Sequence, residues 1–296
     1  MNTRLTLQSL SQRLKTLYDD GEARAVVRLL LEKQLGLSWT DVLCGRLDEL
    51  TDVQQHLLED SMQRLEQGEP VQYVLGEAEF GGRSFHVEPG VLIPRPETYE
   101  LCEWILSTLF SPPSSLFLPP SSLLDIGTGS GCIACTLAAE LPDAQVTAWD
   151  ISDDALRIAR QNAKLHHVNV EFEKVDILQI APSLWGETKE SFSVIVSNPP
   201  YVCLEEATSM EPHVLEYEPK VALFVPDNDP LVFYRAIAKY AQQALKPDGW
   251  LYFEINPRYA EPLVALLEEL QYDQIELKSD SFGKKRMIRA CKETGK

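Results

Sequence analysis

The sequence predicts an α/β fold in which a small helical bundle precedes an open, mostly parallel, doubly wound sheet. Two observations predict it. From residue 122 onward, short apolar runs alternate with helical patterns, and this alternation builds a parallel sheet covered by helices. In residues 1–75, apolar side chains recur only at helical spacing. The 296-residue chain is long enough for both parts to bury a core.

The first 75 residues are predicted to form the bundle. A leucine repeat from Leu7 to Leu17 indicates the first helix, which Asp20-Gly21 separates from a second helix ending at Leu35-Gly36. Thr51 with Gln54 three residues later has the pattern of a capping box, so the last helix is expected to begin there. The apolar stripes of these helices indicate a core and carry no chemistry.

Residues 76–95 show a change of pattern. The run from Phe80 to Phe85 places turn residues between short alternating segments, which predicts a β-hairpin linking the bundle to a second domain over residues 96–296. Within that domain, the Ser/Pro-rich segment 111–122 is expected to be a loop, because prolines do not propagate a helix.

The alternating elements of the second domain follow from residue 122. Two adjacent strands at the end, with no helix between them, imply that the last strand is antiparallel. A turn is expected at Lys246-Pro247-Asp248-Gly249. The expected strands cover 122–126, 144–149, 168–174, 193–196 and a run through Phe253, and the expected helices cover 132–140, 154–166, 230–245 and 260–270.

A glycine-rich loop follows the first of these strands. It consists of Gly127-Thr128-Gly129-Ser130-Gly131 and lies between a strand and a helix, where open α/β sheets bind ligands. A dinucleotide fingerprint needs its third glycine three residues after the second, but here the third glycine comes early. A phosphate loop needs a lysine, and the next residues are Cys132 and Ile133. The loop therefore suits a ligand without a pyrophosphate.

Three aspartates at strand ends match three parts of one such ligand. Asp125 would attract an ammonium or sulfonium group, Asp150 would accept hydrogen bonds from two ribose hydroxyls, and Asp176 would meet an adenine amino group. A plain strand–helix turn with capping carboxylates would explain each feature alone, but not the set. The predicted cofactor is S-adenosyl-L-methionine, and no metal is expected.

The segment Asn198-Pro199-Pro200-Tyr201 follows the apolar strand that ends near Val196, so it faces the same crevice. The side-chain oxygen of Asn198 and the carbonyl of Pro199 can each accept one N–H of a target NH2 group, and Tyr201 can stack on its plane. Pro200 helps to fix the backbone. These four residues are predicted to be catalytic, with Asn198 also close to the cofactor. Taken alone, the segment fits an amide and a nucleobase amine equally well.

Other runs match a known family. Leu92-Ile93-Pro94-Arg95-Pro96-Glu97-Thr98, the glycine loop and the Asn198 segment together resemble the peptide chain release-factor glutamine methyltransferases, the HemK/PrmC family. The likeness runs over nearly the whole chain. Further matching positions are Gly68-Glu69-Pro70 with Tyr73, Gly76 and Phe80, then Glu218-Pro219 with Ala222-Leu223, and Asp280 with Gly283 and Arg286.

The resemblance implies a reaction and a partner. It implies methylation of N5 of the glutamine in the Gly-Gly-Gln motif of class 1 release factors, with the N-terminal bundle helping to dock that protein. The sequence departs from the family at Tyr99, where a glutamate is usual, at Ile177, where an aromatic residue is frequent, and after Leu223, where glycines are missing. These departures concern local cofactor contacts and not the reaction.

Composition limits the alternatives. The net charge of −18 would repel a nucleic acid backbone, and the cluster from Lys284 to Lys292 is interpreted as a solvated strand edge. Six cysteines without a leader sequence indicate a reducing compartment, the cytoplasm, and no apolar run is long enough for a membrane span. We expect a monomer that binds no nucleic acid directly.

Three other functions stay open at this point. The first is a glutamine methyltransferase that acts on a ribosomal protein, the second an exocyclic-amine methyltransferase of DNA or RNA, and the third a non-catalytic binding protein with the same fold. Cys132 and Cys135 form a C-x-x-C pair that we interpret as helix packing. Arg95 and Glu97 could gate the cofactor pocket or form a salt bridge.

Overall fold

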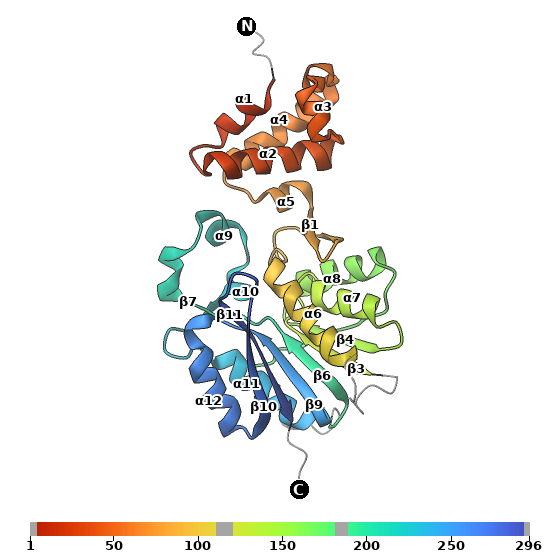
Figure 1. The fold of residues 1–296 in the computed structure, drawn as a ribbon, viewed down its shortest axis with the longest axis vertical. Helices are drawn as coiled ribbons and strands as arrows, with labels where there is room; N and C mark the ends of the chain where they lie inside the picture. Colours follow the sequence, from red (N-terminus) through yellow and green to blue (C-terminus); the bar gives the residue numbers. More distant parts are fainter. Residues whose placement is uncertain (1–4, 111–120, 181–188, 293–296) are drawn as a thin grey trace. The chain divides into compact units, whose positions relative to one another are not determined.

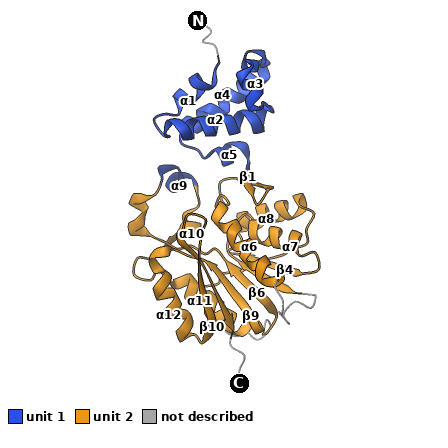
Figure 2. Ribbon diagram, in the orientation of Figure 1, with its two compact units in different colours: residues 1–77, 211–217 blue, residues 78–210, 218–296 orange. Residues whose placement is uncertain are grey.

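The computed structural model describes residues 5–110, 121–180 and 189–292. The chain divides into two compact units (Figure 2). Unit 1 comprises residues 1–77 and 211–217, and unit 2 comprises residues 78–210 and 218–296. Most of the loop expected at 111–122 lies outside the described residues.

Unit 1 is helical (Figure 1). One helix ends and another begins where the sequence predicted. The second helix ends at Gly36, whose left-handed backbone (φ 66°) suits glycine, and Thr51 and Gln54 form the reciprocal hydrogen bonds of a capping box. Buried leucines of the predicted repeats, with Met62, form the core. The helices are α1 (Leu7–Arg13), α2 (Asp20–Leu35), α3 (Trp39–Leu43), α4 (Asp52–Glu66), α5 (Val71–Leu75) and α9 (Pro212–Tyr217).

Helix α9 belongs to unit 1 although it is far from the N-terminal helices in sequence. The Tyr217 hydroxyl donates a hydrogen bond to the Gln67 carbonyl oxygen at 2.9 Å, and the rings of Tyr18 and His213 lie 6.3 Å apart. No periodicity in residues 211–217 indicates that they pack with the N-terminal helices. The segment was therefore not predicted to belong to the bundle.

Unit 2 contains a seven-stranded sheet in the order β10-β11-β9-β6-β3-β4-β5. The last strand, β11, runs antiparallel to β9 and to β10, and the other described pairs of this sheet are parallel. The predicted mostly parallel sheet with an antiparallel last strand is confirmed. The strands are β3 (Ser122–Ile126), β4 (Gln145–Asp150), β5 (Glu171–Lys174), β6 (Phe192–Ser197), β9 (Leu245–Glu254), β10 (Tyr272–Ser279) and β11 (Lys285–Lys292).

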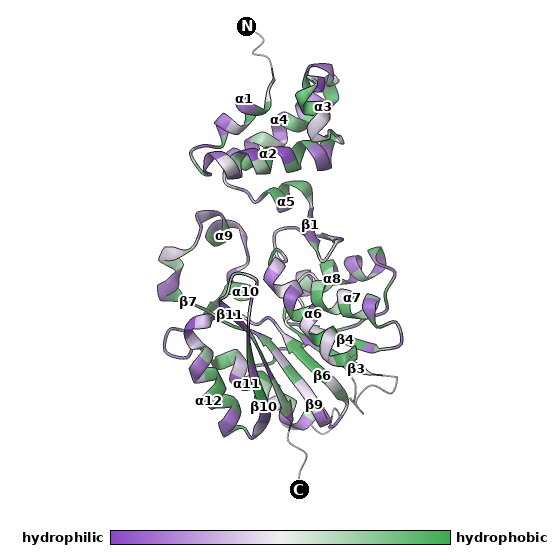
Figure 3. Ribbon diagram, in the orientation of Figure 1, coloured by the Kyte–Doolittle hydropathy of each residue, from purple (hydrophilic) through white to green (hydrophobic). Residues whose placement is uncertain are grey.

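Helices cover both faces of this sheet (Figure 1). Successive strand residues point to opposite faces, so Leu123 and Val194 pack with one group of helices while Leu124 and Ile195 pack with the other. Much of β3 and β6 is hydrophobic (Figure 3), as strands buried on both faces must be. The helices are α6 (Pro96–Phe110), α7 (Cys132–Glu140) and α8 (Asp153–Leu165) on one side, and α11 (Val232–Ala244) and α12 (Ala260–Glu269) on the other.

The hairpin predicted near residue 80 is present as β1 (Glu77–Phe80) and β2 (Arg83–His86), and all but its first residue belongs to unit 2. Asn162 of α8 fastens it. The side-chain oxygen of Asn162 accepts from the backbone N–H of His86 at 2.7 Å, and its Nδ2 donates to the His86 carbonyl at 2.9 Å.

Two features of unit 2 differ from expectation. Helix α6 was not predicted, although it buries Leu101, Trp104 and Ile105. The prediction of a turn at 246–249 was wrong. These residues belong to β9, and they form an irregularity in the pairing of β9 with β6. Asp248 has a positive φ of 61°, so the extra residues bulge out instead of reversing the chain. Shorter elements are α10 (Lys220–Leu223), β7 (Val202–Cys203) and β8 (Phe224–Val225).

No helix among the described residues is long and apolar enough to cross a membrane.

Candidate active site

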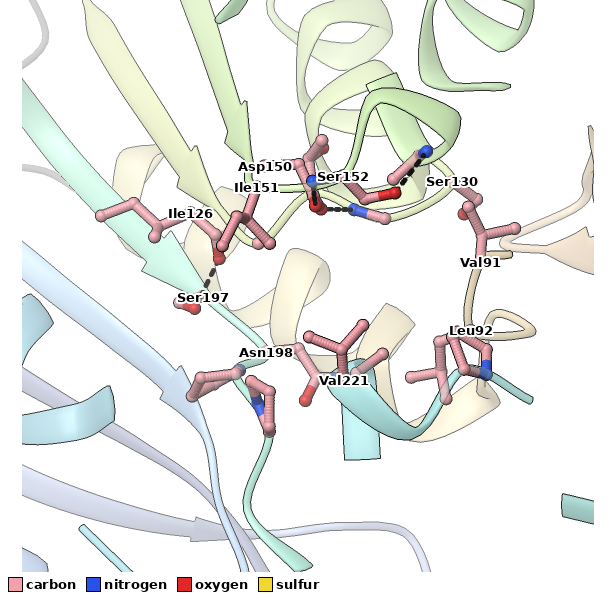
Figure 4. A pocket seen from close by; sticks show the side chains of 18 of the residues that line it. Val91, Leu92, Ile126, Ser130, Asp150, Ile151, Ser152, Ser197, Asn198 and Val221 are labelled. Carbon is pink, nitrogen blue, oxygen red and sulfur yellow. Dashed lines mark hydrogen bonds between the residues drawn. The ribbon is translucent and has the colours of Figure 1, made fainter. Parts of the chain in front are cut away.

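A pocket lies at the carboxyl edge of the parallel strands of unit 2 (Figure 4). The loops that follow β3, β4, β5 and β6 all contribute to its wall, because parallel strands present their carboxyl ends at one edge. Asn198 and Val221 lie across the pocket from Asp150 and Ile151 (Figure 4). The predicted site residues that line it are Gly127, Thr128, Gly129, Ser130, Asp150, Asp176, Asn198, Pro199 and Pro200.

The glycine loop is held from behind by α8. A Cβ atom added to Gly131 would lie 3.0 Å from the Cβ of Ala159, so only glycine allows the loop to pack this closely, and its φ of 80° also favours glycine. Asn162 Nδ2 donates to the carbonyl of Ser130 at 2.8 Å. Gly131 does not line the pocket. Its part is to seat the loop against α8 rather than to contact a ligand.

Asp150 is the last residue of β4 and lines the pocket. Its Oδ2 accepts from the Gly129 N–H and its Oδ1 from the Ser152 N–H, both at 2.9 Å (Figure 4). Burial raises the pKa of this carboxyl group. Since each carboxylate oxygen has two lone pairs, one acceptor position per oxygen is left for a ligand.

Asp176 follows β5 by two residues and also lines the pocket, with its Oδ1 accepting from the Leu178 N–H at 2.9 Å. Ile151 and Ile177 add apolar walls beside these two carboxylates. Acceptors at two neighbouring strand ends, with apolar walls between them, fit a ligand that carries vicinal hydroxyls and a planar ring. This donor and acceptor set fits the nucleoside of S-adenosylmethionine.

Asp125 does not line the pocket, contrary to the expected contact with a sulfonium. It precedes the end of β3 by one residue, so its side chain points into the layer of α6 and α7 and is 1% exposed. The Thr128 hydroxyl donates to its Oδ2 at 2.7 Å, while Oδ1 has no partner. Burial raises the pKa of Asp125 to about 7. Through its hydrogen bond with Thr128, the Asp125 side chain stabilises the glycine loop from the interior of unit 2.

Asn198 directly follows β6. The preceding residue, Ser197, is buried, and its hydroxyl donates to the carbonyl of Ile126 at 2.6 Å (Figure 4). This bond ties the end of β6 to the end of β3 and fixes where the chain enters the pocket. The Asn198 side chain donates from Nδ2 to the Thr98 hydroxyl at 3.2 Å, and its Oδ1 is the atom left to accept from a ligand.

Tyr201 does not line the pocket, contrary to the expected stacking on a target amide. After the two prolines the chain turns toward β9, and the Tyr201 hydroxyl donates to Oε1 of Glu254 at 3.0 Å. Removal from water raises the pKa of this phenol. Tyr201 therefore anchors the segment instead of forming its reactive face.

Comparison with known proteins agrees with this site. A family described as a methyltransferase domain matches residues 120–287, and one described as the PrmC N-terminal domain matches residues 6–76. A release factor glutamine methyltransferase of Bacteroides thetaiotaomicron is 45% identical over 95% of this chain and 97% of its own. The chain belongs to the release factor glutamine methyltransferase family. A member from Flavobacterium psychrophilum is 42% identical over 94% of this chain and 95% of its own.

Membership of this methyltransferase family confirms S-adenosylmethionine as the methyl donor and the chain as an enzyme. The fold has distant counterparts as well. A solved structure described as the delta-N METTL16 MTase domain superposes with a TM-score of 0.52 at 17% identity, over 92% of this chain and 96% of that one. This likeness concerns the fold alone.

In this methyltransferase Arg95 both lines the pocket and forms an ion pair with Glu218, whose side chain is fully buried. The second oxygen of Glu218 accepts from the Ile93 N–H at 3.1 Å. The pair therefore fastens the segment before α6 to the segment before α10, which is the salt bridge that the sequence left open, while gating of the pocket by Arg95 stays a prediction. No described contact links Glu97 to the pocket wall.

Both cysteines of the C-x-x-C pair belong to α7 and are buried. Burial raises the pKa of Cys132 to about 12 and raises that of Cys135 further, so both thiols stay protonated at neutral pH. Among the residues that the structure describes, no three histidine, cysteine or acidic side chains are grouped so as to hold a metal ion.

Sequence reasoning assigned no site role to Thr98, which lines the pocket beside Asn198, or to Glu254, which lies behind Thr98. Thr98 is 3% exposed on α6, and its hydroxyl donates to Glu254 Oε2 at 2.6 Å. Glu254 could have been found by the signal that identified Asp150, since it is an acidic residue at the end of a strand of the same sheet, directly after the apolar run 250–253. Thr98 ends the Leu92–Thr98 run that resembles the family, but that likeness alone gives it no individual role.

Proposed function

We propose that this chain transfers a methyl group from S-adenosylmethionine to N5 of the glutamine in the Gly-Gly-Gln motif of class 1 peptide chain release factors. The observation that carries the proposal is the position of Asn198 and Pro199 in the same pocket as the glycine loop and Asp150. An amide acceptor and a cofactor would then share one pocket. The relatives in this family, described as release factor glutamine methyltransferases, support the choice of substrate.

The cofactor would be held by side chains at the strand ends. Asp150 accepts from the two ribose hydroxyls with its free lone pairs, and Asp176 accepts from the adenine amino group. Gly127 and Gly129 line the pocket, and because they have no side chains a ligand can approach the backbone there closely. S-adenosylmethionine supplies a methyl group made electrophilic by the positively charged sulfur to which it is bound.

The acceptor amide would be held by Asn198 and Pro199. Asn198 Oδ1 and the Pro199 carbonyl each accept one N–H of the glutamine side chain, which fixes the plane of the amide and aims the nitrogen. The nitrogen forms its bond to the methyl carbon as the carbon–sulfur bond breaks, and it then loses one proton to solvent. No basic side chain is needed, and no histidine is found among the described residues that line the pocket.

A substrate assay tests the proposal. Purified enzyme, labelled cofactor and a release factor are expected to give one added methyl group, located by mass spectrometry on the Gly-Gly-Gln glutamine. Replacement of that glutamine by alanine should abolish labelling. Label on another residue, or on a ribosomal protein in place of the release factor, would contradict the assigned substrate.

Replacement of Asn198 by alanine tests the role of the amide clamp. N198A is expected to lower kcat by about 100-fold or more, because the acceptor nitrogen is no longer oriented. Calorimetry should show little change in cofactor affinity. The exposed Asn169 lies outside the pocket, so N169A is the matched control and should keep wild-type kcat. Wild-type turnover in N198A would exclude the clamp.

We infer further that the enzyme works in the cytoplasm as a monomer and that the helices of unit 1 dock the release factor. The net charge of −18 supports a protein rather than a nucleic acid as substrate.

A further inference from the structure

The Thr98 side chain links Asn198 to the buried carboxylate of Glu254. Asn198 Nδ2 donates to Thr98 Oγ1 at 3.2 Å, and Thr98 Oγ1 donates to Glu254 Oε2 at 2.6 Å. The other oxygen of Glu254 accepts from the Tyr201 hydroxyl at 3.0 Å. Thr98 and Glu254 are 3% and 2% exposed, so water does not compete for these bonds.

The available protons fix which group donates in each hydrogen bond from Asn198 through Thr98 to Glu254. A carboxylate can only accept hydrogen bonds, so the single proton of the Thr98 hydroxyl is committed to Glu254. The Thr98 oxygen is then an acceptor toward Asn198, and the only donor on the Asn198 side chain is its NH2 group. The amide must present its NH2 group to Thr98 and its Oδ1 on the opposite side.

The reverse orientation of Asn198 would lose this bond. Its Oδ1 would face the Thr98 oxygen with no proton between the two acceptors. The NH2 group would then replace Oδ1 as the atom offered to a substrate, and a donor there repels the N–H groups of a glutamine amide. Only one of the two amide orientations is therefore productive.

We propose that Thr98 and Glu254 are positioning residues that fix the Asn198 side chain with Oδ1 available as the acceptor for the substrate amide. The proposal rests on the proposed function of Asn198 as the amide clamp. Neither residue need touch the substrate, because each acts through Asn198.

The groups around Glu254 influence whether its carboxyl group is ionised and can accept the two hydrogen bonds. Burial raises the pKa of Glu254, and the nearby Glu97 acts in the same direction. The hydrogen bonds from Thr98 and Tyr201 and the positive charge of Arg286 favour the ionised carboxylate. Arg286 is in turn paired with Asp280 at 3.5 Å. Two donors and one cation thus offset part of the loss of water around a single charge.

Substitution of Thr98 provides the test. T98V replaces the hydroxyl by a methyl group of similar size, and kcat for the release factor is expected to fall by about 10- to 100-fold. KM and the affinity for the cofactor, measured by calorimetry, should stay near wild type. T98S restores the hydroxyl and should recover most of kcat. Thr136 is fully buried in α7 and outside the network, so T136V is the matched control and should keep kcat.

Substitution of Glu254 provides a second test. In E254Q the side chain can donate as well as accept, so the Thr98 proton is no longer committed, and kcat is expected to fall by about threefold to tenfold. If T98V fails to bind the cofactor, E254Q decides, and wild-type kcat in E254Q would overturn the proposal. Wild-type kcat in a folded T98V would overturn it as well.

N198A separates the proposed role of Asn198 as the amide clamp from the proposed positioning role of Thr98 and Glu254. If N198A is inactive while T98V and E254Q turn over normally, the clamp stands and the positioning chain is wrong. If N198A itself is fully active, the proposed function of Asn198 fails. Loss of kcat in T98V with recovery in T98S supports the positioning chain.

Discussion

Asp125 carries a carboxyl group into the interior of unit 2 with one oxygen unpartnered. Its pKa is raised from 3.8 to about 7, so between these pH values the folded protein binds a proton that the unfolded chain releases. The stability that depends on this proton is present at low pH and is lost as the pH rises toward and through 7. Asp125 therefore opposes folding most strongly under mildly alkaline conditions.

Replacement of Asp125 by asparagine should remove this dependence. In urea unfolding at a series of pH values, the free energy of unfolding of D125N relative to wild type is expected to increase from pH 5 to pH 8. A gain on the order of 1–3 kcal/mol corresponds to one buried polar group that lacks a partner. Parallel curves for the two proteins would show that Asp125 keeps its charge in the folded state.

At the level of single residues, the sequence predicted which strand ends meet but not where every side chain points. Asp150 and Asn198 stand at or just beyond a strand end and line the pocket. Asp125 precedes its strand end by one residue, and the alternation of the strand turns it away. The direction of the Tyr201 side chain depends on its hydrogen bond to Glu254, which lies 53 residues further along the chain.

At the level of elements, Asn162 of α8 holds together parts of unit 2 that are far apart in sequence. It is fully buried and bonds to the backbone of His86 in the hairpin and of Ser130 in the glycine loop. N162A would remove these three hydrogen bonds to the backbone. We expect a loss of about 2–4 kcal/mol in the free energy of unfolding, together with weaker cofactor binding.

Urea unfolding and calorimetry check this expectation. The neighbouring Gln161 is exposed on the same helix, so Q161A controls for the change in helix sequence and should leave both measurements near wild type. A drop in N162A no larger than in Q161A would mean that water replaces the lost bonds.

Elements with a clear period were predicted within a few residues, and β3 and α7 begin and end as expected. Helix α6 was missed because its first turn overlaps the Pro94–Thr98 run, whose two prolines and polar residues hide the helical period. The bulge in β9 was mistaken for a turn because Pro247 and Gly249 favour turns locally, whereas the strand pairs with β6 at Leu245 and again from Trp250 onward.

At the level of the whole molecule, charge dominates. A net charge of −18 repels a phosphate backbone over about 10 Å at 0.1 M ionic strength. We expect no mobility shift of duplex DNA or of single-stranded RNA at roughly physiological salt. Binding that weakens steeply as salt increases would contradict this expectation and favour a nucleobase as the methyl acceptor.

The discontinuity of unit 1 constrains how members of this family can be recombined. The chain passes between the units at residues 77/78, 210/211 and 217/218, so the helical unit is built from two separate stretches of sequence. A hybrid that exchanges only the first 77 residues with a relative would bring a foreign partner to Tyr217 and His213, which contact Gln67 and Tyr18. Exchange of unit 1 by recombination therefore requires both stretches to be transplanted together.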